Sequence, residues 1–360
     1  MVVVHIANVD TSILGGVQIA VPRIVKAQSN HATVALINTF GKALEDIEIL
    51  DYNPNFSFDD FCAPYNSPDL VVFHEIYRFE YIKIYKMLKK SGIPYVIVPH
   101  GSLSKQAQKR KFWKKFVANK LFFEAFVRSA VAIQYLSDNE KNMSSFKTAP
   151  SFICGYGLDA FVEKKEKNPS DRKRIIYIGR LEIKTKGLDL LIKAVSNSRD
   201  ILTDKQVHLE IYGPNYNGEH EKLNKMIDSL GVSHLIEVGN EKIGEKKKNL
   251  LLSADCFVQP SRTEGLPMGP LEAMGYGLPC IVTQGTGLGE LIESNEAGIA
   301  CDTSVSGIEK GLKRFLSENV CIEKMSENAM RLIEQRFSTN VVAKNNIEKY
   351  REVISSAIQN

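Results

Sequence analysis

The sequence lacks most of the features that mark disulfide-linked, zinc-binding or membrane-spanning proteins. It has six scattered cysteines and no Cys-x-x-Cys pair, so we interpret them as buried thiols in a reducing cytoplasm. No apolar run approaches the ~20 residues that a membrane-spanning helix needs. The first residues, Met1 to Ile6, predict a strand and include no basic leader or cleavage site. We therefore expect a cytoplasmic protein without a secretory signal.

The chain also lacks a strong excess of either charge. Lys and Arg number 46 against 42 Asp and Glu, which gives a net charge of +4. That charge is too small for a dedicated nucleic-acid-binding protein, and we expect no nucleic-acid partner. At 360 residues, with 44% hydrophobic and 24% charged residues, the composition is that of a globular protein with two domains.

Apolar runs rich in β-formers alternate with helical stretches in two series. The first series lies at residues 2–9, 33–37, 70–73, 95–98, 131–135 and 151–154, and the second at 175–178, 207–212, 235–238, 256–259, 280–283 and 299–301. Continuous apolar strands between helices predict an α/β fold with parallel sheets covered on both faces. We expect domains at 1–162 and 174–338, joined by a charged linker at 163–173. Ligands in such folds bind beyond the carboxyl ends of the strands.

Two carboxylates, Glu264 and Glu272, flank a turn rich in Gly and Pro that leads into an apolar helix. Carboxylates accept paired hydrogen bonds from neighbouring hydroxyls, and the amides at a helix N-terminus attract an anion. A nucleotide sugar carries both kinds of group. In the alternative interpretation, Glu264 caps the helix and Glu272 is an ordinary solvated residue.

Basic residues and a histidine also follow predicted strands. Arg180 comes directly after a strand, and Lys186 precedes the helix that begins near Leu188. These cations could neutralise a diphosphate, although exposed loops often carry such residues for no specific purpose. His100 follows the strand at 95–98, where parallel sheets bind ligands. His5 lies within the first strand, and we expect it to be satisfied inside the core.

Five segments occur in the order found in one enzyme family. They are Gly15-Gly16-Val17, Pro99-His100-Gly101, Gly179-Arg180-Leu181 with Lys186-Gly187, Pro260-Ser261, and Glu264 to Glu272. With them the chain resembles, over essentially its whole length, the retaining GT-B glycosyltransferases marked by Glu, seven residues and Glu (glycosyltransferase family four). The resemblance implies two Rossmann-like domains facing each other across a cleft, with a C-terminal helix at about 339–360 that crosses back onto the first domain.

The resemblance further implies retaining transfer of a hexose from a nucleotide-diphosphate sugar, which we expect to be a UDP-sugar. Glu264, His100, Arg180 and Lys186 would be catalytic: Glu264 and His100 contact the transferred sugar, and the two cations contact the phosphates. The expected donor-binding residues are Gly16, Arg180, Lys186, Glu264, Gly265, Leu266, Met268 and Glu272, with Glu272, Asn240 and Ile243 at the nucleoside. For Gly15-Gly16 a plain strand-to-helix turn is an equal alternative.

The Asp-x-Asp triplet that holds a divalent cation in other glycosyltransferases is absent. We therefore expect no metal and no cofactor. We expect a glycan or a polyprenyl-diphosphate-linked acceptor, in the synthesis of bacterial lipopolysaccharide O-antigen, capsule or exopolysaccharide. A nucleotide-sugar epimerase and a non-catalytic nucleotide-sugar-binding protein remain alternatives.

The segment 105–123 is basic and aromatic, contains the single tryptophan of the chain, and has no acidic residue. Such a helix is typical of peripheral contact with an anionic membrane, here the cytoplasmic face of the inner membrane. Equally, its apolar stripe could pack on the first domain while the lysines face water. The residues that we expect at the acceptor or the membrane are Lys109, Arg110, Lys111, Trp113, Lys114 and Lys115.

Overall fold

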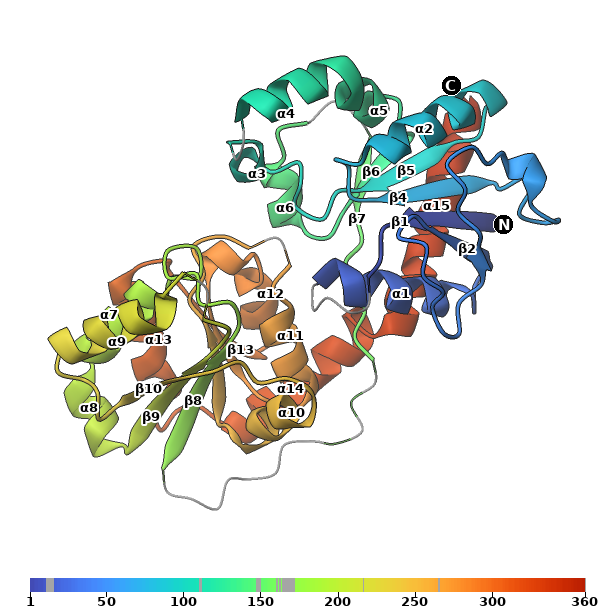
Figure 1. Cartoon of the computed structure of the whole chain (residues 1–360). Coiled ribbons are helices and arrows are strands. Elements are labelled where there is room, and N and C mark those ends of the chain that lie inside the picture. Colours follow the sequence, from blue (N-terminus) through green and yellow to red (C-terminus); the bar gives the residue numbers. More distant parts are fainter. Residues whose placement is uncertain are drawn as a thin grey trace. The chain divides into compact units, whose positions relative to one another are not determined.

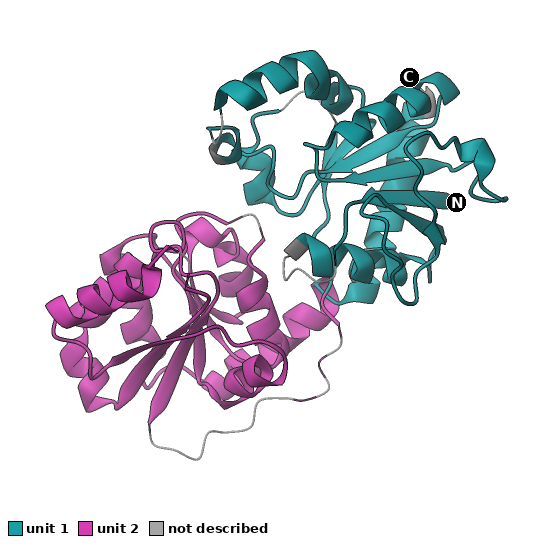
Figure 2. Ribbon diagram, viewed as in Figure 1, with its two compact units in different colours: residues 1–157, 337–360 teal, residues 158–336 magenta. Residues whose placement is uncertain are grey.

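The computed structural model describes residues 1–10, 16–109, 112–146, 150–159, 161, 163, 172–215, 217–264 and 266–359. They form two compact units (Figure 2). Unit 1 contains residues 1–157 and 337–360, and unit 2 contains residues 158–336. In the parts of the chain that the structure describes, no helix combines the length and the apolar character needed to cross a membrane.

Unit 1 is built on a parallel sheet with the strand order β3-β2-β1-β4-β5-β6-β7. Its central strands are buried along their whole length, because helices cover both faces. The strands are β1 (Val2–Ala7), β2 (Thr33–Asn38), β3 (Ile49–Leu50), β4 (Leu70–His74), β5 (Tyr95–Val98), β6 (Ala132–Tyr135) and β7 (Ser151–Ile153).

Helices α1 and α15 pack against each other in unit 1, as Figure 1 shows. Tyr85 of α2 and Phe126 of α5 belong to an aromatic core with Phe73 and Tyr95 of the sheet. The helices are α1 (Gly16–Gln28), α2 (Phe79–Ser91), α3 (Lys105–Lys109), α4 (Phe112–Ala118), α5 (Glu124–Arg128), α6 (Asp138–Met143) and α15 (Thr339–Gln359), with a 3-10 turn at Phe58–Asp60 and a π-helical turn at Asn119–Phe123.

Unit 2 repeats this plan with a second parallel sheet in the order β10-β9-β8-β11-β12-β13. The chain reverses its direction of winding between β8 and β11, which is where ligands bind in open α/β sheets. The strands are β8 (Lys173–Ile178), β9 (Val207–Tyr212), β10 (Ile236–Gly239), β11 (Cys256–Gln259), β12 (Cys280–Thr283) and β13 (Gly298–Cys301).

Helices cover both faces of the second sheet (Figure 1). Helix α7 packs against α8, α9 and α13, whereas α11 packs against α14. The helices are α7 (Leu188–Asn197), α8 (Arg199–Asp204), α9 (Glu219–Ser229), α10 (Gly244–Ser253), α11 (Met268–Gly275), α12 (Gly289–Ser294), α13 (Val305–Phe315) and α14 (Ile322–Arg336), with a 3-10 turn at Gln284–Thr286.

The last helix completes unit 1 after the chain has passed through unit 2. Tyr350 of α15 is buried, and its hydroxyl donates to Oε1 of Gln134 on β6 at 2.8 Å. Where the chain leaves and re-enters unit 1, Gly157 and Thr339 touch. A Cβ atom on Gly157 would lie 2.3 Å from the Thr339 Cα, so only glycine fits there.

Candidate active site

The loops after β8 and β11 lie next to each other, because these two parallel strands are neighbours in the unit 2 sheet. The loop after β8 carries Arg180 and Lys186, and the loop after β11 carries Glu264. Although 78 residues separate Lys186 from Glu264, their side chains meet: Lys186 Nζ lies 2.6 Å from Glu264 Oε1. Each side chain is only 12% exposed. The switch point of the sheet therefore holds a nearly buried ion pair.

Two further donors fix the Glu264 carboxylate. Ser261 Oγ donates to Oε1 at 2.6 Å and Gln259 Nε2 donates to the same oxygen at 3.2 Å. Gln259 also donates to Ser261 Oγ at 2.8 Å. Charge-assisted bonds of this kind restrict a carboxylate to one orientation before a ligand arrives.

A second ion pair joins the loop after β11 to helix α7, which follows Lys186 in the chain. The Arg262 guanidinium donates to both carboxylate oxygens of Asp189 on α7, at 2.7 and 3.0 Å. Burial raises the pKa of Asp189, but hydrogen bonds from Arg262 and Lys184 outweigh it and leave that pKa below its ordinary value. Gly187 adopts φ +67, and a Cβ atom there would meet the Pro260 carbonyl oxygen at 2.0 Å. The loops thus touch through their backbones, and this contact holds Lys186 opposite Glu264.

Arg180 does not join this pair. Its side chain is 62% exposed and forms an ion pair with Glu182 at 2.8 Å. The structure therefore brings together Lys186 and Glu264 of the expected catalytic set, while Arg180 projects from the same strand end with a local partner.

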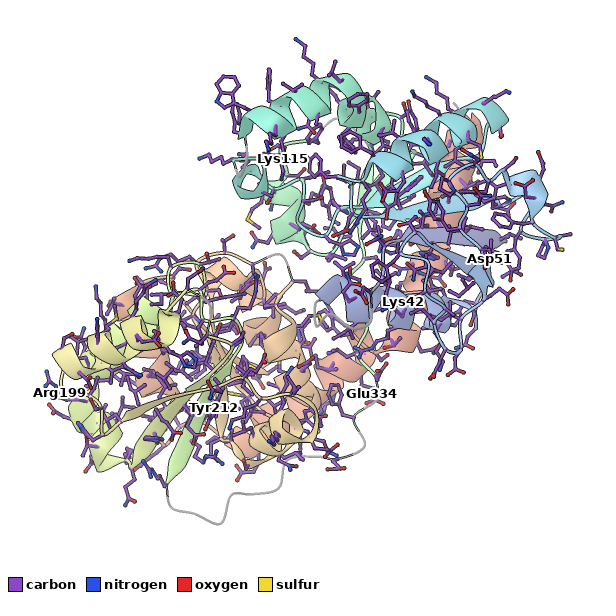
Figure 3. The ribbon with its side chains drawn as sticks, in the orientation of Figure 1. Lys42, Asp51, Lys115, Arg199, Tyr212 and Glu334 are labelled. Carbon is purple, nitrogen blue, oxygen red and sulfur yellow. The ribbon has the colours of Figure 1, made fainter. Side chains whose placement is uncertain are left out.

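Glu272 lies on α11 and forms an ion pair with Lys247 of α10, which the sequence analysis had not selected. The two side chains are 29% and 30% exposed. Leu266 and Met268, which begins α11, are partly buried, and Gly265 lies outside the described residues. Asn240 and Ile243 are exposed between β10 and α10. Nearby, Lys242 lies over the ring of Tyr212, which Figure 3 labels, with Nζ 4.8 Å from the centroid.

His100 lies in unit 1, at the carboxyl end of β5, with φ +49. The loop is anchored by Glu140, whose carboxylate accepts from the backbone amides of Gly101 and Leu136. Nε2 of His100 lies 3.1 Å from Nδ1 of His74. The Tyr156 hydroxyl contacts Nδ1 of His100 most closely and lies 3.2 Å from Nε2.

The histidine contacts continue into the core of unit 1. Nε2 of His74 lies 2.9 Å from Nδ1 of His5, and Nε2 of His5 lies 2.8 Å from Oε1 of Gln28. The expectation that His5 is satisfied inside the core is confirmed. Burial lowers the pKa of His5 to about 4 and that of His100 to about 3. Burial, with charge repulsion from both neighbours, also lowers the pKa of His74 well below its ordinary value. All three imidazoles are therefore neutral near pH 7.

Gly16 is the first residue of α1, and Gly15 lies outside the described residues. Across the described part of the chain, no three His, Cys, Asp or Glu side chains are grouped so that they could hold a metal ion.

Most large apolar side chains of the basic segment stay exposed, whereas Phe123 is buried in the core of unit 1. Phe112, Phe116 and Leu121 are exposed, and Trp113 is 76% exposed. The packed-stripe alternative is thus wrong for them, and within 121–123 only Phe123 is fully buried. Lys109 and Lys114 are also exposed, and Arg110 and Lys111 lie outside the described residues.

Lys115, labelled in Figure 3, differs from the neighbouring lysines. Its Nζ donates to the Ala107 carbonyl at 2.7 Å and lies 4.6 Å from the centroid of the Tyr77 ring. It therefore fastens α4 to the rest of unit 1.

Residues 160–335, which are nearly the whole of unit 2, match the family described as glycosyl transferases group 1. This part of the chain belongs to the group 1 glycosyltransferases. An uncharacterized glycosyltransferase from Methanocaldococcus jannaschii is 31% identical over 183 residues, which cover 50% of this chain and 45% of that protein. The chain thus spans about half the length of this relative.

Two other comparisons extend over more of the chain. The putative teichuronic acid biosynthesis glycosyltransferase TuaC of Bacillus subtilis is 25% identical over 290 residues, which cover 75% of this chain and 67% of that protein. Anabaena HepE, solved in complex with UDP and glucose, matches with a TM-score of 0.70 and 18% identity, over 97% of this chain and 99% of that one. The structural likeness establishes the expected GT-B fold, with two α/β units each built on a parallel sheet.

Proposed function

We propose that the chain transfers a hexose, with retention of configuration, from a UDP-sugar to a hydroxyl of a glycan acceptor. The observation that carries this proposal is the Lys186–Glu264 pair, fixed at the switch point of the unit 2 sheet. One member offers positive charge to a diphosphate, and the other accepts hydrogen bonds from sugar hydroxyls. HepE, solved with UDP and glucose, supports the choice of UDP.

In the proposed mechanism the acceptor hydroxyl attacks from the face that the departing UDP leaves, and the leaving phosphate takes its proton. Lys186, with Arg180, stabilises the charge that develops on the diphosphate. Because these cations supply the positive charge, we propose that the reaction needs no divalent metal and no cofactor. Glu264 orients the transferred sugar, Glu272 holds the ribose hydroxyls, and Asn240 and Ile243 lie beside the base. We propose that Gly16 of unit 1 takes part in donor binding and that His100 of unit 1 contacts the transferred sugar.

The acceptor is a glycan linked to polyprenyl diphosphate, in the assembly of a bacterial surface polysaccharide such as lipopolysaccharide O-antigen, capsule or exopolysaccharide. TuaC, named for teichuronic acid biosynthesis, supports a polysaccharide product. The reaction would take place in the cytoplasm, at the inner face of the membrane.

The transfer proposal is tested by incubating the full chain with UDP-sugars and a lipid-linked glycan and measuring UDP release. A thermal-shift screen identifies the donor first, because a ligand at a hundred times its Kd adds about 2.7 kcal/mol of stability. Glu264→Ala should abolish release. Glu334→Gln on α14, an exposed residue labelled in Figure 3, is the control and should behave as wild type.

Two results would contradict the proposal. The first is a Glu264→Ala variant with near wild-type turnover. The second is conversion of the UDP-sugar without an acceptor, which would indicate an epimerase. The anomeric configuration of the product, read by NMR, tests retention separately.

We further propose that the exposed rings and lysines of α4 and the adjoining π-helical turn bind an anionic bilayer. Trp113, Phe116 and Leu121 offer apolar side chains that unit 1 does not cover. Each lysine near such a surface contributes on the order of 1 kcal/mol, and Lys109, Lys114 and Lys120 are exposed. This placement would bring the chain to a lipid-linked acceptor.

Co-sedimentation with phosphatidylglycerol vesicles tests the surface. We expect a triple variant with Lys109, Lys114 and Lys120 changed to Glu to lose binding, whereas Lys193→Glu on α7 should retain it. Vesicles of phosphatidylcholine alone should bind weakly. If the triple variant sediments like wild type, the segment does not contact the membrane.

A further inference from the structure

A continuous row of buried polar groups links His100 to the interior of unit 1. It runs from the Tyr156 hydroxyl through His100, His74 and His5 to the Gln28 amide. The members come from the loop after β7, the loop after β5, β4, β1 and α1. Neighbouring rings lie 5.2 to 5.4 Å apart between centroids. His5, His74 and Gln28 are buried, so their polar atoms must be satisfied by neighbours in place of water, whereas His100 is partly exposed.

With Oε1 of Gln28 facing His5, the row has one consistent direction of hydrogen bonding. Each imidazole is neutral and so has one N–H and one lone pair. Oε1 of Gln28 can only accept, so the proton of His5 is on Nε2 and its Nδ1 accepts from His74. His74 therefore carries its proton on Nε2 and accepts from His100 at Nδ1. The same reasoning leaves Nε2–H on His100 and a lone pair on its Nδ1, which accepts from the Tyr156 hydroxyl.

The orientation of the Gln28 amide sets this direction. Oε1 faces Nε2 of His5 at 2.8 Å, whereas the opposite orientation of the amide would place an N–H donor there and reverse every hydrogen bond of the row. The carbonyl at the end of the row thus decides which nitrogen of His100 carries the proton.

We propose that Gln28, acting through His5 and His74, holds His100 as the Nε2–H tautomer, so that Nδ1 of His100 accepts a hydrogen bond from a hydroxyl of the sugar substrate. The Tyr156 hydroxyl occupies this lone pair when no substrate is bound. The inference rests on the proposed function, since a sugar supplies the hydroxyl. Gln28, His5 and His74 are positioning residues, and Tyr156 is the group that the substrate replaces.

The tautomers are read directly from long-range 1H–15N spectra of histidine-labelled full-length protein. We expect one tautomer at each of the three sites, with the proton on Nε2. In Gln28→Met the terminal acceptor is lost, and His100 should become a mixture of tautomers. In Tyr156→Phe the tautomer of His100 should stay single, because it is set from the opposite end of the row.

Kinetics add a second readout. Loss of one oriented hydrogen bond corresponds to about a tenfold change, which should appear in Gln28→Met as a lower kcat/KM for the UDP-sugar. The matched control is Gln134→Met, which alters a second buried glutamine of unit 1 whose amide donates to the Cys154 carbonyl at 3.0 Å. It should lose stability and keep a single tautomer at His100.

Three results would overturn the proposal: a proton on Nδ1 of His100 in the wild type, a His100 tautomer that Gln28→Met leaves unchanged, or one that Tyr156→Phe alone alters. Failure of the proposed function is distinguishable from these, since it would leave the expected tautomers in place while no UDP-sugar released UDP.

Discussion

The sheets of the two units share one strand order, and in each the direction of winding changes between the first and the fourth strand. The side chains at these two switch points differ in charge. In unit 2 the switch between β8 and β11 is bridged by charged groups, Lys186 and Glu264 at 2.6 Å. In unit 1 the strands β1 and β4 at the corresponding switch are bridged by two neutral imidazoles, His5 and His74 at 2.9 Å. The strand order thus determines where these side chains meet. Their chemistry determines whether the site offers charged groups or an ordered row of neutral hydrogen bonds.

We expect the largest effect from breaking the ion pair between Lys186 and Glu264 in unit 2. Lys186→Met should lower turnover by about 10²–10³, because the departing diphosphate loses a preorganised cation. It should also lower the stability of unit 2 by about 3 kcal/mol, since Glu264 remains nearly buried without its partner. UDP release and calorimetry measure the two effects.

The double variant Lys186→Met/Glu264→Gln separates these effects. It removes both charges and should recover most of the lost stability while staying inactive. A double variant that regained turnover along with stability would show that the pair is only structural.

The next largest effect concerns the ion pair between Arg262 and Asp189. Asp189→Asn should lower stability at pH 7 by about 2 kcal/mol, because Arg262 loses a charged bidentate partner. Since the folded pKa of Asp189 lies below its ordinary value, the contribution is present above the unfolded pKa and is lost as the pH falls through the folded one. The wild type and Asp189→Asn should therefore differ constantly near neutrality and converge in acid. A difference that persisted unchanged to pH 2 would contradict the assignment.

The neutral histidines of unit 1, His5, His74 and His100, should respond to pH differently from the Asp189 ion pair of unit 2. The pKa of His5 is about 4 and that of His100 about 3, so their NMR signals should not titrate above about pH 5.5. Below pH 6.5 the unfolded chain takes up protons that the folded one does not. Unit 1 should then lose about 1.4 kcal/mol per pH unit for each histidine down to its folded pKa. The same signals in urea provide the unfolded reference, and titration of His100 near pH 6.5 would refute its neutrality.

The smallest effect should come from the partly exposed pair Lys247–Glu272 in unit 2. Lys247→Met should change stability by less than about 1 kcal/mol, because Lys247 and Glu272 are each about one-third exposed and screened by solvent. We expect a changed KM for the UDP-sugar, since Glu272 is proposed to hold the ribose. A stability loss like that of Lys186→Met would mean that this pair supports the fold.

Sequence patterns predicted the regular parts of the fold well. All twelve predicted strands exist, with ends within two residues of those expected, because buried parallel strands are continuous apolar runs. The two-residue strand β3 (Ile49–Leu50) was missed, since so short a run has no detectable pattern. The described residues of segment 105–123 form helices at 105–109 and 112–118 and a π-helical turn at 119–123, and periodicity alone does not predict the π-helical turn.

The candidate site was predictable only where residues are close in sequence or belong to a motif. Lys186 and Glu264 were selected from motifs, and the structure places them in contact. Lys247 lies in a run of three lysines, and nothing in the sequence tells which of them meets Glu272. His5 and His74 are 69 residues apart, and their contact depends on the order of the strands in the sheet. No local sequence pattern predicts it.

The return of α15 to unit 1 makes the two units unequal in how they can fold. Unit 2 is one continuous stretch, residues 158–336, so its core can form without any other part of the chain. Unit 1 is made of two stretches, and its core includes Tyr350 and Asn346, both buried beside Gln134. A chain cut after Arg336 therefore keeps every residue of unit 2 and leaves unit 1 open beside β6.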